Sequence, residues 1–236
     1  MNNDTMIQHF GVWIKKAPTL NISRDTYAVI DKKSSTWTPR ISELRCYKNA
    51  EDRRKIFDDD ECKIYSDDWC KKHREKCLLN FDLNMLFFAK LKKEKFESCI
   101  EKLLSSNKEI SKVDNLNDWN QICGIYILIL DEFKQVYIGQ STNIKQRVLC
   151  HWRKKKQFDR LIFGSVENSV LSIDSFGALD TTRIYALETQ FLDDEERRLS
   201  KKIPDRYKLN RIGGGKFNNE FDKYDALANT NHRKLK

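Results

Sequence analysis

The chain has 236 residues, enough for one or two domains, of which 33% are charged and 39% apolar. No run approaches the ~18 consecutive apolar residues of a membrane span, and the N-terminus lacks the basic-then-apolar layout of a secretory signal. We therefore expect no membrane partner and a cytoplasmic protein, nucleoid-associated if the source is bacterial. The formal net charge of +9 favours polyanionic partners, nucleic acid first.

The first part of the chain predicts a mostly helical region over residues 1–118. Ser66, followed by two acidic residues, is typical of a helix start, and residues 82–104 place apolar side chains at roughly helical spacing. Residues 1–45 contain two of the three prolines and are compatible with short strands or turns. Residues 105–118 are polar and weakly periodic, which favours a linker.

A second domain is predicted over residues 119–217, because seven of the eight glycines lie from Gly124 onward. Its pattern predicts strands at residues 122–130, 136–139 and 168–174, and helices from Ser141 or Thr142 to about Lys156 and from Thr181 or Thr182 to about Arg198. Residues 218–236 read as a basic tail. The predicted fold class is α/β (α+β), with a small, mainly antiparallel sheet flanked by helices.

Two tyrosines stand beside glycines in residues 124–140, GIYILILDEFKQVYIGQ. If the two apolar runs form an antiparallel hairpin with an even-numbered loop, Tyr126 and Tyr137 point to the same face. An odd loop or a bulge would separate them. The glycines would let a ligand or another backbone come close, so this hairpin can place two phenols on one wall of a cleft.

The next predicted helix adds polar groups to that wall. Ile144, Val148 and Trp152 are spaced as a buried stripe. Arg147 and His151, one turn apart, flank the stripe. A cation and a titratable imidazole are therefore expected together at the edge of the sheet.

A carboxylate is expected on the inward face of the last predicted helix. Ile184, Leu187 and Phe191 form its apolar stripe, and Glu188 lies within that stripe. Burying a carboxylate is costly unless it is paired or bound to a metal. Glu188 is therefore a candidate metal ligand, and an ion pair with Arg183 is the structural alternative.

This ordered set of residues resembles the GIY-YIG nuclease family. The members of the set are Gly124 to Tyr126, Tyr137 to Gly139, Arg147, His151, Glu188 and Asn210. Each residue alone has an ordinary structural explanation, but the six in order are specific. The resemblance covers roughly residues 123–215, under half of the chain, and leaves the N-terminal region unassigned.

The resemblance implies a three-stranded sheet flanked by helices and cleavage of phosphodiester bonds with one divalent metal. Glu188 would be the sole protein ligand of Mg²⁺, which keeps most of its waters, and Mn²⁺ would substitute. The metal would neutralise charge on the phosphate and the leaving oxygen. Arg147 would donate to the non-bridging phosphate oxygens in bidentate fashion.

The resemblance also implies roles for the remaining catalytic residues. Tyr126 would act as the base toward the attacking water, with His151 taking or relaying its proton. A free phenol has a pKa near ~10, so Tyr126 would need a lowered value. Tyr137 would line the pocket, and Asn210 would shape the site by hydrogen bonding. The sequence leaves open which of the tyrosines or the histidine is the general base.

A basic segment surrounds the predicted site. Besides Arg147 it contains Lys145, Arg153, Lys154, Lys155, Lys156 and Arg160, with Asp159 as its only acid. A solvated helix face is the common explanation of such a run. Beside a phosphodiester site, a ridge that follows the phosphates of nucleic acid is favoured.

The seven cysteines are odd in number and scattered, which indicates reduced thiols rather than a disulfide framework. Cys62, Cys70, His73 and Cys77 would be four ligands for zinc. However, residues 70–77 lie in a predicted helix, where seven residues rise about 10.5 Å. Two thiolates on one zinc lie at most about 4.6 Å apart. A structural zinc site is therefore disfavoured.

These residues predict an enzyme, a divalent-metal-dependent endonuclease that hydrolyses DNA. A compact chain with an extra region ahead of the catalytic domain is more typical of a restriction-type or defence nuclease than of a homing or repair enzyme. Two alternatives stay open: a nucleic-acid-binding module without catalysis, and a nuclease acting on single-stranded DNA or on RNA. Magnesium-dependent cleavage would separate an enzyme from a binding module.

The role of the N-terminal region also stays open. Phosphate contacts position an enzyme without specifying sequence, so a selective enzyme would need another reader. Trp13, Trp37 and Trp69 are the candidate contacts of such a reader. The alternative is that this region braces the catalytic sheet or forms the contact of a homodimer.

Overall fold

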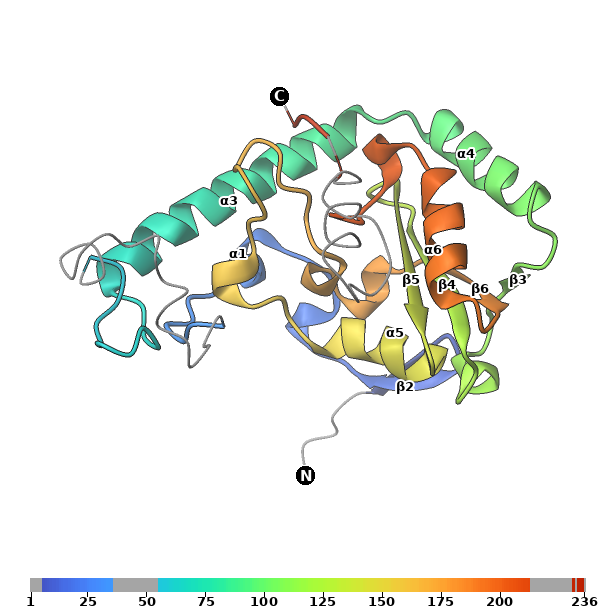
Figure 1. The fold of residues 1–236 in the computed structure, drawn as a ribbon, viewed down its shortest axis with the longest axis horizontal. Coiled ribbons are helices and arrows are strands. Elements are labelled where there is room, and N and C mark those ends of the chain that lie inside the picture. The colour runs from blue at the N-terminus through green and yellow to red at the C-terminus, as the bar shows by residue number, and fades with distance from the viewer. Residues whose placement is uncertain (1–5, 36–54, 213–230, 232, 236) are drawn as a thin grey trace.

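The computed structural model describes residues 6–35, 55–212, 231 and 233–235. It shows a mixed α+β protein with two antiparallel sheets, which confirms the predicted fold class. The larger sheet lies at one end of the molecule, and the long helix α3 (Asp67–Lys90) extends away from it (Figure 1). Trp37, Cys46 and most of the expected tail lie outside the described residues.

The larger sheet has the strand order β3-β6-β4-β5, and every pairing in it is antiparallel. Its strands are β3 (Ser111–Lys112), β4 (Gly124–Leu130), β5 (Gln135–Ser141) and β6 (Arg183–Glu188). The expected three-stranded sheet thus gains a short fourth strand at one edge. The other outer strand is β5, which carries the second tyrosine of the motif.

The hairpin of β4 and β5 has the register that the sequence predicts. Its loop consists of residues 131–134, an even number. Tyr126 pairs with Gly139 and Leu128 pairs with Tyr137, so the two tyrosines lie on one face of the sheet. The prediction that both phenols share a wall is confirmed.

The strand expected at residues 168–174 is wrong. This segment is irregular and mostly buried, and it leads into the one-turn helix η5 (Ile173–Ser175). Side chains of α3 bind its backbone instead of a neighbouring strand, since Asn80 and Asn84 donate to the carbonyl of Ser169 at 2.8 and 2.9 Å. An apolar run can pack as a buried loop when side-chain amides satisfy its carbonyls.

The helix expected from Thr181 or Thr182 to Arg198 is also wrong. The strand β6 occupies its first half, and α6 (Leu192–Lys201) begins only after Phe191. Ile184 and Ala186 alternate with more exposed neighbours, as the period of a strand requires. The acidic first turn of α6 marks where the helix starts.

The helix α5 (Ile144–Arg153) is confirmed with shorter bounds than predicted. Asn143, not Ser141 or Thr142, caps its N-terminus through its side chain. Ile144 and Val148 are fully buried, which confirms the inward stripe. The helix therefore presents the flank that carries the arginine and the histidine to the open side of the sheet.

The described residues of the N-terminal region are mostly helical, as predicted, and begin with a hairpin. Its elements are β1 (Met6–His9), β2 (Val12–Lys15), α1 (Arg24–Tyr27), α3 and α4 (Lys93–Ser105). Ser66 caps α3 by accepting from the amide of Trp69 at 3.3 Å. The helical pattern expected over residues 82–104 breaks at Leu91 and Lys92, between α3 and α4.

Along the described chain, short 3-10 helices also occur at η1 (Pro18–Leu20), η3 (Leu116–Trp119), η4 (Phe158–Arg160), η6 (Ala178–Asp180) and η7 (Asp205–Tyr207).

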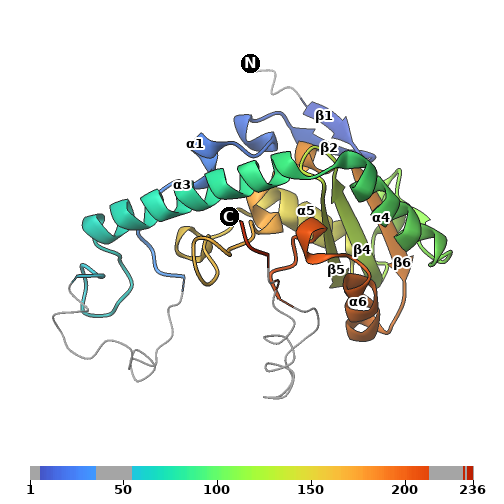
Figure 2. The same cartoon turned by 90° about the horizontal axis from the view of Figure 1, so that it is seen from above.

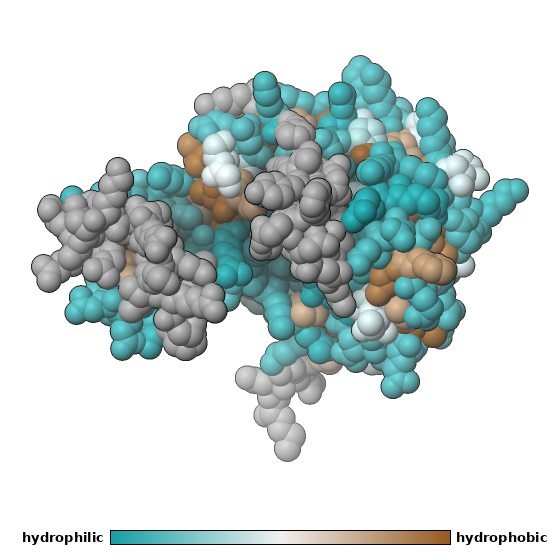
Figure 3. All heavy atoms as spheres, in the orientation of Figure 1, coloured by the Kyte–Doolittle hydropathy of each residue, from teal (hydrophilic) through white to brown (hydrophobic). Residues whose placement is uncertain are grey.

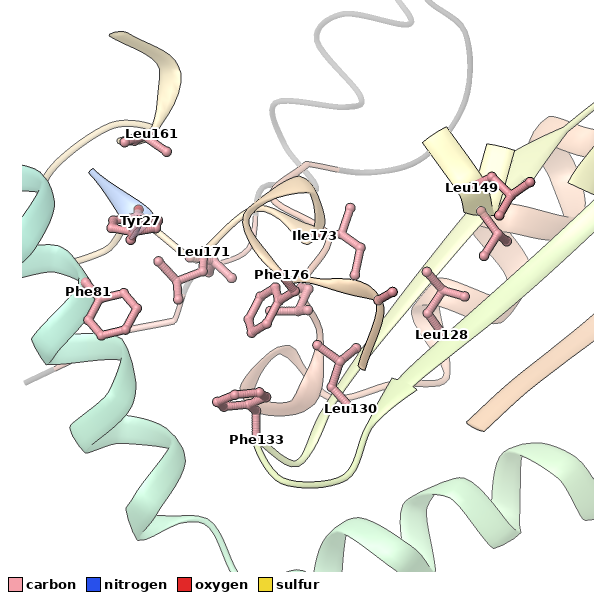
Figure 4. Close-up of a cluster of buried hydrophobic side chains, with 14 of the residues drawn as sticks. Tyr27, Phe81, Leu128, Leu130, Phe133, Leu149, Leu161, Leu171, Ile173 and Phe176 are labelled. Carbon is pink, nitrogen blue, oxygen red and sulfur yellow. The ribbon is translucent and has the colours of Figure 1, made fainter. Parts of the chain in front are cut away.

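Alternate residues of β4 face two hydrophobic cores. Tyr126, Leu128 and Leu130 face a core that includes α1, α3, α5 and β2. The alternate isoleucines of β4 face a second core with α4 and α6. Figure 4 shows the first core reaching from Tyr27 and Phe81 to β4, and Figure 2 shows α4 and α6 beside the sheet, away from α5.

The linker expected over residues 105–118 is wrong, because this segment adds a strand to the larger sheet and is anchored by buried side chains. It contains β3 and the start of η3, and Val113 and Leu116 are buried. The amide of Val113 donates to the carbonyl of Ile184 at 2.9 Å. The described residues on the two sides of the expected boundary at residue 118 therefore share one core.

Part of the expected basic tail is buried rather than free. Arg233 and Leu235 are 4% and 3% exposed. The guanidinium of Arg233 donates to Gln135 Oε1 at 2.6 Å and lies 4.8 Å from the centre of the Phe87 ring.

Most of the coloured surface in Figure 3 is hydrophilic. Within the described ranges, no helix is both long and apolar enough to cross a membrane.

Candidate active site

A cleft of about 730 Å³ lies beside β5, the outer strand that ends the sheet. The five residues predicted as catalytic all line it: Tyr126, Tyr137, Arg147, His151 and Asn210. They come from β4, β5, α5 and the segment after η7. The fold thus brings together side chains that are up to 84 positions apart in the sequence (210 − 126).

The two motif glycines make room for parts of the chain itself. The ring centres of Tyr126 and Tyr137 are 6.2 Å apart. A Cβ atom at Gly139 would lie 2.3 Å from the phenolic oxygen of Tyr126, so only glycine leaves space for that side chain. A Cβ atom at Gly124 would lie 2.0 Å from the carbonyl oxygen of Leu187 in β6. The sequence prediction of a close approach is confirmed, with protein groups in both places.

His151 connects Tyr126 to an aspartate that the sequence reasoning missed. The Nε2 atom of His151 lies 2.8 Å from the Tyr126 oxygen, and its Nδ1 atom lies 2.5 Å from Asp174 Oδ1. An ionised carboxylate can only accept, so Nδ1 carries the proton that it donates to Asp174. In the neutral imidazole Nε2 is then the acceptor, and the phenol of Tyr126 donates to it.

The charges of His151 and Asp174 follow from their burial and from the hydrogen bond between them. His151 is 3% exposed, and burial lowers its pKa below the ordinary 6.5, although the Asp174 carboxylate opposes the shift. Burial alone would raise the pKa of Asp174, but the hydrogen bond from His151 holds that pKa below its usual value. At neutral pH the pair is therefore a neutral imidazole and a carboxylate.

The tyrosines are not activated in the protein alone. Burial raises the pKa of Tyr126 well above 10, the neighbouring Tyr137 raises it further, and the positive charge of Arg147 only partly opposes this. Burial also raises the pKa of Tyr137, to about 12. The lowered Tyr126 pKa that the base role would need is therefore not produced by the protein groups alone.

Arg147 lies on the exposed side of α5, one turn before His151, and lines the cleft. Its charge favours the ionised form of Tyr126 and of Asp174. An exposed guanidinium over a cleft can donate to an anion from two nitrogens. Arg147 thus lies in the cleft beside Tyr126 and His151, as the sequence predicted.

Glu188 does not occupy the place predicted for it. It is the exposed last residue of β6, opposite Gly124, and it is absent from the described lining of the cleft. Arg183, its alternative partner, instead forms ion pairs with Glu97 and Asp131. The predicted inward position of Glu188 on a helix is wrong because the segment is a strand that ends at this residue.

A different glutamate reaches the cleft. Glu196 lies in the middle of α6, is 7% exposed and lines the cleft together with the two tyrosines. Its Oε2 atom accepts from Gln140 Nε2 at 2.7 Å, which ties the carboxylate to β5. Its negative charge raises the pKa of both Tyr126 and Tyr137. Glu196 is therefore a buried carboxylate of the cleft, held close to both tyrosines.

Asn210 organises the cleft through the backbone of β5. Its Oδ1 atom accepts from the amide of Ile138 at 3.1 Å, and its Nδ2 atom donates to the carbonyl of the same residue at 2.7 Å. Both groups lie on the outer edge of the strand, next to Tyr137. The predicted hydrogen-bonding position of Asn210 is thereby confirmed, and its contact is to the strand that carries the tyrosine.

The basic segment divides into two groups. Lys156 and Arg160 line the cleft, together with Arg211, which the sequence reasoning missed. Arg153, Lys154 and Lys155 do not line the cleft but a small pocket of about 60 Å³ between α5 and residues of the N-terminal region, and Lys156 lines this pocket as well as the cleft. Lys145 lies in neither lining. Of the six basic residues expected to contact nucleic acid, Lys156 and Arg160 therefore line the cleft and the other four do not.

The cysteines and the aromatic residues of α3 are packed. Cys70 and Cys77 are buried thiols on one uninterrupted helix, as the argument against zinc required. The His73 ring donates from Nε2 to the carbonyl of Phe158 at 3.0 Å. Trp69 is stacked between Tyr65, at 3.9 Å, and His73, at 4.5 Å between ring centres. Both faces of its indole are therefore occupied.

Glu196, Asp174 and Arg211 complete the cleft but were not predicted. Glu196 had a usable signal, since it falls between Leu192 and Leu199 at helical spacing after an acidic first turn. Asp174 lies in an irregular segment with no periodicity, and Arg211 follows the last described 3-10 helix. Only the folded chain shows that these two residues meet the motif.

Within the part of the chain that the structure describes, no group of three or more His, Cys, Asp or Glu residues could hold a metal ion. A site with a single carboxylate is not such a group. Comparisons with protein-family models, with curated proteins and with solved structures found no match. The family resemblance therefore rests on the motif residues and on where they lie.

Proposed function

We propose that this protein is an endonuclease of the GIY-YIG type, which hydrolyses phosphodiester bonds of nucleic acid, DNA first, with a divalent metal ion. The observation that carries the proposal is the convergence of the motif on one cleft. Two tyrosines, an arginine, a histidine and an asparagine meet there, and a buried glutamate joins them from α6. A nuclease needs a cation for the phosphate, a proton acceptor for water and a carboxylate for a metal, and these three are present.

The donor set fits a hydrated Mg²⁺ ion. Glu196 would hold it, since this carboxylate lines the cleft beside both tyrosines, and Gln140 fixes one of its oxygens by a 2.7 Å hydrogen bond. One protein carboxylate suits Mg²⁺, which retains waters and binds substrate phosphate. When bound, the ion would neutralise charge on the phosphate and the leaving oxygen.

Arg147 would orient the phosphate and stabilise the charge that builds on its oxygens. It is exposed on the cleft side of α5, so its guanidinium can reach a ligand that has not entered the core. Two parallel N–H donors match two non-bridging oxygens. Replacing Arg147 by lysine keeps the charge but loses this geometry.

Tyr126, His151 and Asp174 would move the proton of the attacking water. A free tyrosinate is disfavoured because burial raises the Tyr126 pKa. The hydrogen bond to Nε2 removes this difficulty, since Tyr126 can pass its proton to His151 while it accepts the proton of the water. The imidazolium formed would be stabilised by Asp174, 2.5 Å from Nδ1.

Two carboxylates of the chain provide the test. Glu196→Gln keeps the shape of the side chain and an acceptor for Gln140, but removes the negative charge. Loss of metal assistance, worth several kcal/mol, should lower Mg²⁺-dependent cleavage at least ~10²-fold. Glu188→Gln, on an exposed strand end, is the matched control and should cleave at the wild-type rate.

Cleavage is measured on plasmid DNA, on single-stranded DNA and on RNA, with Mg²⁺ and with Mn²⁺. If the wild-type protein binds these substrates but cuts none of them, it is a binding module and not a nuclease. If Glu188→Gln is inactive and Glu196→Gln is active, the metal ligand is the residue first predicted from the sequence.

A further inference from the structure

Three cations lie together on the side of the cleft formed by residues 156–163. Lys156, Arg160 and Arg211 all line it, and none of them has a part in the proposed proton transfer. The amide of Lys156 donates to the carbonyl of Asp174 at 3.2 Å, and Arg211 donates from Nη1 to the carbonyl of Arg160 at 3.1 Å. Backbone contacts thus place these three residues beside the catalytic histidine pair.

The positive charge of this group is only partly balanced. Arg211 donates to three neutral carbonyls, including that of Val170 at 2.7 Å, and Arg160 donates to the carbonyl of Ser35 at 2.9 Å. Lys156 is half-buried, and its ammonium forms no ion pair or side-chain hydrogen bond with any residue that the structure describes.

The two nearest acids are already engaged. Asp159 accepts from the amide and the hydroxyl of Ser35 and from the hydroxyl of Tyr65. Asp174 accepts from His151. Their charges act on Lys156 from a distance, yet burial and the neighbouring Arg211 still lower the pKa of Lys156 below its ordinary value. An ammonium held in this place is stabilised when an anion enters the cleft.

We propose that Lys156, Arg160 and Arg211 form a second phosphate subsite, which binds a backbone phosphate adjacent to the one that is cleaved. This inference rests on the proposed function. A strand whose scissile phosphate lies at Arg147 continues through the same cleft, so a neighbouring phosphate meets this group. Phosphate contacts fix the register of a strand without reading its bases. The subsite therefore positions the bond to be cut.

The inference separates lysines that composition alone cannot distinguish. Lys155 is adjacent to Lys156 in the sequence but is exposed and lies outside the cleft lining. A general electrostatic attraction would use both side chains. A built subsite would use Lys156 and not Lys155, which makes these two residues a matched pair.

The test measures binding by the full-length protein that carries Glu196→Gln, so that the ligand stays intact. The probe is a single-stranded oligothymidylate, in which every phosphate is equivalent, with Mg²⁺ present. Adding Lys156→Gln should weaken binding about tenfold at low salt, the loss of one charge-assisted contact. It should also reduce the slope of log Kd against log salt by about 0.7, the value for one phosphate on a single strand.

Three further variants sharpen the result. Lys155→Gln should change neither quantity measurably, Lys156→Arg should restore the slope, and Arg160→Gln should reproduce the Lys156→Gln loss. Equal effects of Lys155→Gln and Lys156→Gln would overturn the subsite while leaving the nuclease proposal intact. A parent protein that neither binds the probe nor, as wild type, cleaves nucleic acid would overturn both.

Discussion

The two halves of the chain contribute to the cleft in different ways. Every residue of its described lining falls between Tyr126 and Ile212, and the N-terminal half contributes none. Yet the N-terminal half shares the core beneath the tyrosines, from Val12 of β2 to Phe88 of α3. One half supplies the side chains that line the cleft, and the other supplies their support. The folded unit that holds the cleft is therefore much longer than the motif.

The N-terminal half makes specific hydrogen bonds to the irregular segments beside the cleft. Asn80 and Asn84 donate to the carbonyl of Ser169, in the loop that precedes Asp174. The hydroxyl of Tyr65 donates to Asp159 at 3.0 Å, and His73 donates to the carbonyl beside it. These bonds fix the segment that carries the subsite cations. The structure therefore favours bracing as the role of the N-terminal half.

The largest effect should come from removing that half. A fragment that starts at Asn115 loses α3, α4 and β3, and it exposes the surfaces on which Phe81, Phe88 and Phe96 are buried. Truncation of a single buried phenylalanine costs about 3–5 kcal/mol, while a whole domain is stable by about 5–15 kcal/mol. We expect a fragment that does not fold, as measured by circular dichroism and thermal melting.

A soluble fragment with a cooperative melt would contradict this comparison. Nucleic-acid cleavage by such a fragment, with altered selectivity, would return the N-terminal half to the role of a reader. The full-length chain carrying Glu196→Gln is the control, because it should melt like the wild type while it lacks activity.

The next largest effect should come from a substitution in the half that lines the cleft. Asp174→Asn should lower the rate of cleavage by ~10²–10⁴-fold, because an amide that donates to Nδ1 moves the imidazole proton to Nε2. Nε2 can then no longer accept from Tyr126. The fold should be retained, since the amide keeps the size of the carboxylate.

The pH profile distinguishes this effect from a general loss of charge. His151 must be neutral to accept a proton, and its lowered pKa places the acid limb of wild-type activity below pH 6.5. Removing Asp174 removes a charge that raises this pKa, so the acid limb should move to lower pH. Asp159→Asn, another acid of the cleft without contact to His151, should leave the limb in place. An unchanged limb in Asp174→Asn would argue against the relay.

Local sequence rules were sufficient for the hairpin and its tyrosines. An even loop fixes which residues share a face, and helical spacing placed Arg147 and His151 on one side of α5. These predictions succeeded because each depends on neighbours in the sequence. In the structure these side chains line the same cleft.

The rules failed where two periodicities competed. Ile184, Leu187 and Phe191 fit a helix, but Ile184, Ala186 and Glu188 fit a strand equally well. The central position of β6 between two strands decided the outcome, and this is a tertiary effect. The error placed the expected metal ligand eight residues too early, at Glu188 in β6 instead of at the proposed Glu196 in α6. Asp174 could not be predicted because a packed loop has no period.

A smaller effect should follow from loosening the support. Asn80 Nδ2 donates to the carbonyls of Val166 and Ser169 at 2.7 and 2.8 Å. Asn80→Ala leaves both without this donor, so the free energy of unfolding should fall by about 1–3 kcal/mol, measured by urea denaturation. KM should rise and kcat should fall, because this loop carries the Val170 carbonyl that Arg211 binds and leads to Asp174. Asn168→Ala, on the exposed part of the same loop, should be neutral; an equal loss there would assign the effect to the loop in general.

The smallest effect is expected at the tryptophans that the sequence suggests as candidate contacts of a sequence reader. Trp69 has rings on both faces, so it offers no surface to a base. Of the two candidate tryptophans that the structure describes, Trp13 is the exposed one, at 62%. A base stacked on an aromatic side chain contributes about 1–3 kcal/mol, so removing such a contact lowers the affinity about tenfold or more.

If the N-terminal half only supports the cleft, Trp13→Ala should leave the Kd for oligonucleotides within about twofold and leave the cleavage pattern unchanged. Trp69→Phe, which preserves the stack, is the matched control for tryptophan loss. A tenfold weakening in Trp13→Ala alone, with an unchanged melting temperature, would show that the supporting half also binds nucleic acid and would end the division of roles between the two halves.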